Sequence, residues 1–232
     1  MGVFVLKIVV AGSFQSGKSS YIQALDNKAL NIMTIDKSGK KTTIAMDIAS
    51  YEYQGIKISL FGTPGLLRFK TIRSIVMEGA DGVIFMFDGV NSDNDDSALQ
   101  ILNEIRSKLP RNTPIVYVVN KSDVAGCREI DVVRAQNYIP KEATLISISA
   151  LNKVNVQIPI QTIISMIKIS LSPIIKTLEK YEENPLGLKV ALEKSAEKIL
   201  EFLNAMEMRG ILSINRHTMT FKLAEKAKLF MV

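Results

Sequence analysis

Residues 12–20 read GSFQSGKSS and match the pattern G-x-x-x-x-G-K-[ST] without a gap. They lie between a run with strand character and a segment with helical spacing, which is the context that this pattern requires. Glycines let such a loop curl until its backbone N–H groups point at phosphate oxygens, and the start of the helix adds partial positive charge. Lys18 would reach the β- and γ-phosphates of a nucleotide, and the Ser19 hydroxyl would bind Mg²⁺.

Two further motifs concern the base of that nucleotide. VVNKSD supplies Asn120, Lys121 and Asp123 at the end of an apolar run. A carboxylate at Asp123 can accept hydrogen bonds from both the ring N–H and the exocyclic amine of guanine, whereas adenine presents the opposite pattern. SISALNK, at 147–153, would present the backbone N–H of Ala150 to the guanine oxygen. Together these motifs predict a guanine nucleotide.

The motifs need a scaffold that brings them to one edge, and the hydrophobic pattern predicts one. Apolar runs alternate with helical patterns up to about residue 170. Strands are expected at 3–12, 43–53, 56–62, 82–90, 114–123 and 143–150, and helices at 18–30, 97–109 and 157–169. This alternation predicts an α/β, P-loop NTPase fold, with a mostly parallel six-stranded sheet and helices on both faces.

The order of elements changes at Ser172–Pro173, where serine at a cap and proline at a first helical position predict a new helix. Helices at 173–183, about 186–193 and 195–209 are then followed by two strands around Arg216 and His217. Three helices and a β-hairpin outline a winged-helix-like module. We therefore expect a nucleotide-binding domain at 1–171 and this module at 172–232. The alternative is an irregular helical extension packed on the first domain.

The composition is that of an ordinary globular protein, with 47% hydrophobic residues and a net charge of +6. The charge is dispersed, with 19 basic and 15 acidic residues up to Ser172 and 10 and 8 after it, which disfavours nucleic acid as a partner. The single cysteine, Cys127, favours a reducing, cytoplasmic location. The apolar window 156–175 contains Lys168 and is expected to be a buried amphipathic helix, so that any membrane contact is peripheral.

From about residue 3 to about residue 170 the chain resembles the Ras-superfamily small GTPases, particularly the Rab-like and prokaryotic MglA-like members. TIAMDI (43–48) is similar to the Rab switch I segment, and RFKTI (68–72) with the following GADGVIFMFDGV is similar to switch II and the next strand. The resemblance implies that Thr43 ligates Mg²⁺ and that Gly65 binds the γ-phosphate. It implies GTP or GDP with Mg²⁺ as cofactors, a protein effector and a GTPase-activating partner.

The chain departs from that family where hydrolysis is catalysed. Switch II of the family normally reads D-x-x-G-Q, and here Gly62 and Leu66 replace the aspartate and the glutamine. The missing carboxylate predicts weaker Mg²⁺ binding, although MglA-like proteins also lack it. Leucine cannot orient the attacking water, and Phe14 would obstruct an arginine finger. We therefore expect slow hydrolysis of GTP, with Gln15 as a candidate substitute beside the phosphates.

Two functions are compatible with these residues. In the first, the protein is a guanine-nucleotide switch with slow GTPase activity, whose loops 31–43 and 62–73 signal to a protein partner when the γ-phosphate orders them. In the second, it is a non-hydrolysing GTP sensor that acts through residues 172–232, with nucleic acid as one candidate target. Glutamates interleave with Lys194, Lys198 and Arg209, which disfavours DNA.

The candidate site residues fall into three sets. Lys18, Thr43 and Gly65 are assigned to catalysis, and Ser19 and Thr43 to Mg²⁺. The nucleotide-binding set comprises Ser13, Phe14, Gln15, Ser16, Gly17, Lys18, Ser19, Ser20, Thr43, Gly65, Asn120, Lys121, Asp123, Ser149, Ala150 and Leu151.

Overall fold

The computed structural model describes residues 4–30, 33–35, 41–43, 46–182 and 184–231, without the side chains of 33–35, 41–43 and Leu186. The chain divides into two compact units. The larger unit comprises residues 7–51 and 58–164, and the smaller comprises residues 1–6, 52–57 and 165–232.

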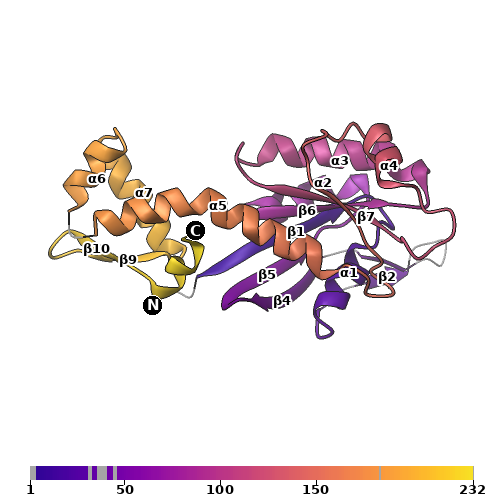
Figure 1. The fold of residues 1–232 in the computed structure, drawn as a ribbon, viewed down its shortest axis with the longest axis horizontal. Coiled ribbons are helices and arrows are strands. Elements are labelled where there is room, and N and C mark those ends of the chain that lie inside the picture. Colours follow the sequence, from indigo (N-terminus) through magenta and orange to yellow (C-terminus); the bar gives the residue numbers. More distant parts are fainter. Residues whose placement is uncertain (1–3, 31–32, 36–40, 44–45, 183, 232) are drawn as a thin grey trace. The chain divides into compact units, whose positions relative to one another are not determined.

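Among the described residues, the central sheet has six strands in the order β4-β5-β1-β6-β7-β8 (Figure 1). These are β1 (Val5–Gly12), β4 (Asp47–Tyr53), β5 (Ile56–Gly62), β6 (Gly82–Asp88), β7 (Ile115–Asn120) and β8 (Leu145–Ser147). Strands β1, β6, β7 and β8 run parallel. A tight turn at Gln54–Gly55, where both residues have positive φ, connects β4 to β5. The predicted mostly parallel sheet is therefore confirmed.

Helices accompany this sheet, and a small separate hairpin lies before β4. The helices are α1 (Lys18–Leu25), α2 (Lys70–Met77), α3 (Asp95–Lys108), α4 (Ile130–Gln136) and α5 (Gln157–Lys180), with short 3-10 turns η1 (Leu67–Phe69) and η2 (Ser92–Asn94). The hairpin pairs β2 (Met33–Ile35) with β3 (Lys41–Thr43). The strand expected at 43–53 consequently begins at Asp47, because Thr43 belongs to β3.

The core of the larger unit follows the alternation of side chains along the strands. Val83, Phe85 and Phe87 of β6 belong to a buried cluster with residues of α2, α3 and α4. Ile84 and Met86 are equally buried and point to the opposite face. Figure 1 shows α1 and α5 on that other face. Burial on both sides explains why β6 is an uninterrupted apolar run.

Two helices of the larger unit were not anticipated. In α2 the buried positions include Arg73, a charged residue within the apolar stripe that would otherwise indicate a helix. Helix α4 has only seven residues, and Val133 is its one buried position. Both segments are short, with eight and seven residues, so each offers a hydrophobic pattern of only about two turns.

The smaller unit contains the C-terminal part of α5 and the elements that follow. These are α6 (Pro185–Ala191), α7 (Ala196–Met208), β9 (Leu212–Asn215), β10 (Thr220–Leu223) and η3 (Glu225–Phe230). Strands β9 and β10 are antiparallel, with Leu212 opposite Leu223. The buried Phe230 ring meets Phe4 edge to face, with ring centroids 5.0 Å apart. Two helices and a hairpin follow α5 in the expected order, whereas the helix expected at 173–183 is the end of α5.

The helix boundary predicted at Ser172–Pro173 is wrong. Helix α5 runs from Gln157 to Lys180 with Pro173 inside it. Proline removes one backbone hydrogen bond from a helix, and burial of Ile175 and Leu178 beyond it keeps this helix continuous. The smaller compact unit takes up the chain from residue 165. The expected domain division between 171 and 172 stays a prediction.

The apolar window expected to form a buried amphipathic helix lies in α5. By length and composition alone this helix is long and apolar enough to cross a membrane. Its buried positions Ile160, Ile163, Ile164 and Ile167 follow the i, i+3, i+4, i+7 spacing of a helix with one packed face. The expectation of an amphipathic, packed helix is therefore confirmed.

Candidate functional site

The loop between β1 and α1 has the curled backbone that GSFQSGKSS predicts. Gly12 and Gly17 have positive φ angles of 146° and 91°. A Cβ at Gly12 would overlap the Met86 carbonyl oxygen, and a Cβ at Gly17 would overlap Asn120 Nδ2. Glycine is required at both positions, because the loop passes this close to β6 and to the end of β7.

Lys18 lies against this loop and is only 8% exposed. Its Nζ donates a hydrogen bond to the Ser13 carbonyl oxygen at 2.6 Å, and the Ser16 hydroxyl donates to the same oxygen at 2.9 Å. Burial lowers the pKa of Lys18 to about 8. A Cβ on Gly65 would lie 2.7 Å from Lys18 Nζ and from the Phe14 backbone nitrogen. Gly65 of the switch II segment therefore sits directly on the phosphate loop.

Asn120 connects the two sides of the site. Its Nδ2 donates to the Ser16 carbonyl oxygen at 3.0 Å, and its Oδ1 accepts from the Ala150 backbone N–H at 3.0 Å. The Ala150 N–H, expected to face the guanine oxygen, therefore already has an acceptor. A backbone N–H can be shared between two acceptors, so the guanine role of Ala150 stays a prediction. Exposed Asp123 lines the cleft beside Asn120.

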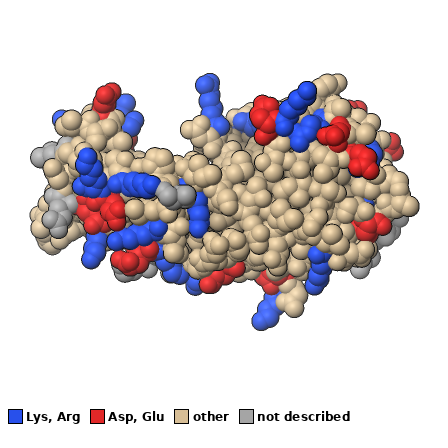
Figure 2. Space-filling view, in the orientation of Figure 1, with Lys and Arg blue, Asp and Glu red and all other residues tan. Residues whose placement is uncertain are grey.

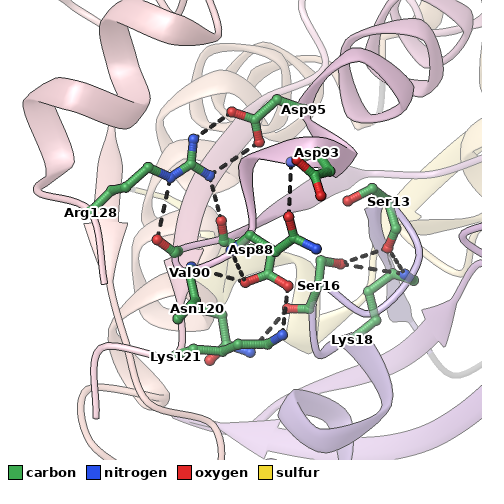
Figure 3. A network of polar contacts seen from close by, with 12 residues as sticks. Ser13, Ser16, Lys18, Asp88, Val90, Asp93, Asp95, Asn120, Lys121 and Arg128 are labelled. Atoms are coloured by element: carbon green, nitrogen blue, oxygen red, sulfur yellow. Dashed lines mark hydrogen bonds and ion pairs between the residues drawn. The ribbon is translucent and has the colours of Figure 1, made fainter. Parts of the chain in front are cut away.

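A polar network behind Lys121 was not anticipated (Figure 3). The buried Asp88 carboxylate accepts from Lys121 Nζ at 2.5 Å and from the Val90 N–H at 3.0 Å. The guanidinium of Arg128 donates to the Asp88 carbonyl oxygen and pairs with Asp95, both at 2.6 Å. Asp88 is the last residue of β6 and the one charged residue in GVIFMFDGV, which was the signal available in the sequence.

A cleft of about 610 Å³ runs along these motifs. It is lined by Phe14, Gln15, Gly17, Lys18, Ser19, Ser20, Gly65, Asn120, Lys121, Asp123, Val124, Ala150 and Leu151. All but Val124 belong to the predicted set. Ser13, Ser16 and Ser149 are buried and do not line the cleft. The side chain of Thr43 and most of the loop 31–43 lie outside the described residues, so their Mg²⁺ and switch roles stay predictions.

The switch II segment that carries Gly65 and Leu66 is held by one buried arginine. Arg73 is 0% exposed, and its guanidinium forms four hydrogen bonds. Three go to the carbonyl oxygens of Pro64, Leu66 and Leu67, at 3.2, 2.7 and 3.1 Å. The fourth goes to Glu104 Oε2 of α3 at 2.9 Å. Backbone carbonyls give no sequence signal, so this anchor could not be foreseen.

The remaining edge of the site carries Ser19, the predicted Mg²⁺ ligand. Its Oγ donates to Asp47 Oδ2 at 2.7 Å. Asp47 begins β4 and is 2% exposed. Burial raises the pKa of Asp47, which the hydrogen bond from Ser19 and the charge of Lys18 oppose. Asp47 was not among the predicted site residues, although it stands in the quoted segment TIAMDI.

A phosphate loop after β1, with an Asn-Lys-x-Asp motif after β7 of a mostly parallel sheet, defines a P-loop GTPase. Comparison with known families agrees. The chain belongs to the Ras family, whose family model matches residues 7–169. Members of this family are GTPases that bind GTP or GDP with Mg²⁺.

Similar proteins carry Rab names. Ras-related protein Rab-11A of Dictyostelium discoideum is 29% identical over 169 residues, covering 71% of this chain and 76% of that protein. Ras-related protein RABA4b of Arabidopsis thaliana is 26% identical over 204 residues, covering 84% and 88%. The chain is thus a Rab-like small GTPase, a GTP-binding switch. The family match ends before α6 and says nothing of the elements after it.

Proposed function

We propose that this small GTPase binds GTP and GDP with Mg²⁺, hydrolyses GTP slowly on its own, and signals to a protein effector through loops 31–43 and 62–73. The observation that carries the proposal is the Asn120 side chain, which holds the phosphate loop at Ser16 and the base-side turn at Ala150. One buried amide thus joins the two halves of a single cleft. Its volume of about 610 Å³ suits one small-molecule ligand.

Each side of the cleft fits one part of a guanine nucleotide. The buried ammonium of Lys18 and the curled loop around Gly17 would hold the phosphates. The exposed carboxylate of Asp123 would accept both N–H donors of guanine. Ser19, with Thr43 as its predicted partner, offers the oxygen ligands that Mg²⁺ prefers. When bound, Mg²⁺ would neutralise charge on the phosphate oxygens.

Slow hydrolysis is proposed from Leu66, which follows Gly65 in the chain, and from Phe14 and Gln15, which line the cleft. Leu66 stands where a polar side chain would be needed to orient water, and the Arg73 guanidinium holds its carbonyl group at 2.7 Å. Phe14 lines the cleft at the place where an arginine from a partner would enter. Gln15 also lines the cleft and is the candidate substitute for the missing glutamine.

The test is single-turnover hydrolysis of GTP by excess protein with Mg²⁺, comparing the natural chain with Leu66→Gln. We expect the natural chain to be nearly inert and Leu66→Gln to be faster by about tenfold or more, because the amide can orient water. Leu67→Gln is the matched control, since Leu67 is an exposed neighbour on the same segment. Rapid hydrolysis by the natural chain with no gain from Leu66→Gln would contradict the slow rate. Equal affinity for GTP and ATP would contradict the switch itself.

For the smaller unit we keep the winged-helix-like interpretation and propose a role in protein contact or packing. Figure 2 shows basic and acidic side chains intermixed over this part of the chain. Glu207 Oε2 pairs with Arg216 at 2.6 Å, which neutralises a charge that DNA would need. The alternative is a GTP sensor that acts on nucleic acid. It predicts that the protein shifts the mobility of labelled DNA in a gel at low salt, and the absence of a shift would exclude it.

A further inference from the structure

The position where Gly62 lacks a side chain is filled by a side chain from the neighbouring strand. A Cβ built on Gly62 would lie 2.7 Å from Asp47 Oδ2 and 3.0 Å from Asp47 Cβ. Gly62 ends β5 and Asp47 begins β4, its neighbour in the sheet. The carboxylate of Asp47 therefore lies where an aspartate at position 62 would begin.

The surroundings of Asp47 indicate what its carboxylate serves. Its Oδ2 accepts from Ser19 Oγ at 2.7 Å. Its Oδ1 has no hydrogen-bond partner among the described residues, although the whole side chain is 2% exposed. A buried carboxylate with an unpaired oxygen is costly to keep unless something of positive charge or a hydrogen-bond donor uses it. The hydroxyl beside it is the one predicted to bind Mg²⁺.

We propose that Asp47 supplies from β4 the carboxylate of the Mg²⁺ site that Gly62 cannot supply from β5. The inference rests on the proposed function, because the ion would bind together with the nucleotide phosphates. Mg²⁺ usually keeps several waters and is held through one or two carboxylates. Asp47, next to Ser19, is placed to accept hydrogen bonds from such waters, so Mg²⁺ binding is retained and is not weakened by the loss at position 62.

The same geometry makes the two carboxylates mutually exclusive. A Cβ at position 62 would be closer to Asp47 Oδ2 than real Cβ atoms come to oxygen, so an added side chain would push Asp47 away from Ser19. The third close atom, Ile22 Cδ1 at 2.8 Å, is the flexible end of a side chain and can move. We therefore expect Gly62→Asp alone to harm the site and the exchange of both residues to restore it.

The experiment measures the affinity of the full chain for a fluorescent GDP analogue, once with saturating Mg²⁺ and once with excess EDTA. The ratio of the two affinities is the Mg²⁺-linked gain. We expect Asp47→Asn to lower this gain by about 10- to 100-fold, the usual cost of losing a group that supports a metal site. Its affinity in EDTA should stay within about threefold of the natural chain, because asparagine can still accept from Ser19.

Three further variants sharpen the result. Glu52→Gln, an exposed carboxylate on the same strand, should leave the gain unchanged. Gly62→Asp alone should lose the gain, and Asp47→Gly combined with Gly62→Asp should recover most of it. If the double variant does not fold, as judged by thermal unfolding, the Asp47→Asn result alone decides.

The outcomes separate this inference from the proposed function. An unchanged gain in Asp47→Asn, or an equal loss of affinity with Mg²⁺ and with EDTA, overturns the metal role of Asp47 and leaves nucleotide binding intact. Failure of the natural chain to bind the GDP analogue under either condition overturns the proposed function instead.

Discussion

Asn120 at the end of β7 illustrates how much one buried side chain determines at the residue scale. It uses a donor on Ser16 and an acceptor on Ala150, so neither aspartate nor leucine could replace it. Lys18 and Asp47 are buried nearby, and burial lowers the pKa of Lys18 and raises the pKa of Asp47. The cleft is thus built from polar groups that are costly to bury without a ligand.

A pH dependence of nucleotide affinity follows for Lys18. Burial lowers its pKa to about 8, and a phosphate would favour the charged form. Below pH 8 Lys18 of the free protein already carries its positive charge. Above pH 8 Lys18 must take up a proton when the nucleotide binds. We expect GDP affinity to be constant between about pH 6.5 and 7.5 and then to fall, by at most about tenfold per pH unit above 8.

Titrations with a fluorescent GDP analogue at constant ionic strength would measure this profile. Lys18→Met should bind more weakly at every pH and show no such fall. A flat profile for the natural chain up to pH 9 would contradict the lowered pKa.

At the scale of elements, the switch II segment of this chain is anchored. The Arg73 guanidinium, on α2, binds three backbone carbonyls of the preceding segment and Glu104 of α3. A loop whose carbonyls are held in this way is less free to change conformation than one that contacts only water. If this segment moves when the nucleotide changes, either these hydrogen bonds break or Arg73 moves together with the segment.

Replacing Arg73 by methionine keeps the length of the side chain and removes all its donors. We expect faster amide hydrogen exchange at residues 62–69 and a loss of about 3 kcal/mol in the free energy of unfolding, the lower end for breaking a buried ion pair. Hydrogen exchange with mass spectrometry and urea titration measure the two effects. Arg68→Met, an exposed arginine on the same segment, is the control. Equal exchange in both variants would show that Arg73 is not the anchor.

At the scale of the whole molecule, the chain combines a Ras-family unit with elements that the family match does not reach. All residues that line the cleft around Lys18 and Asn120 belong to the larger unit. The smaller unit takes residues 1–6 and 52–57 together with residues from 165 onward. Its C-terminal turn is therefore packed against Phe4, as the contact of the Phe230 and Phe4 rings shows.

Phe230→Ala tests whether that contact stabilises the smaller unit. Truncating a fully buried phenylalanine costs about 3–5 kcal/mol, and Phe230 is 0% exposed. We expect a loss of this size in urea titration, with GDP affinity within about twofold of the natural chain, because no residue of the cleft is changed. Leu229→Ala, at an exposed neighbour, should cost little. Stability unchanged in Phe230→Ala would mean that the terminal turn is not part of the folded unit.

Patterns in contiguous residues were sufficient to predict the phosphate loop, the guanine motif and the parallel sheet. Gly17 and Lys18 are six or fewer positions from Gly12, and Asn120 and Asp123 share one strand end. Such short-range patterns can be read directly, because local backbone geometry and side-chain chemistry together define them. The sequence likewise shows that position 62 lacks a carboxylate. It does not show that Asp47 occupies the space beside Gly62.

Tertiary structure decided the remaining features, because each depends on residues that are distant in sequence. Strand pairing places Asp47 against Gly62, and helix packing places Arg73 against Glu104. Helix α5 passes through Pro173, since the burial of side chains on both sides outweighs one lost backbone hydrogen bond. A local signal gives the chemistry of a residue and its preferred backbone, whereas its partners depend on the register and packing of the whole fold.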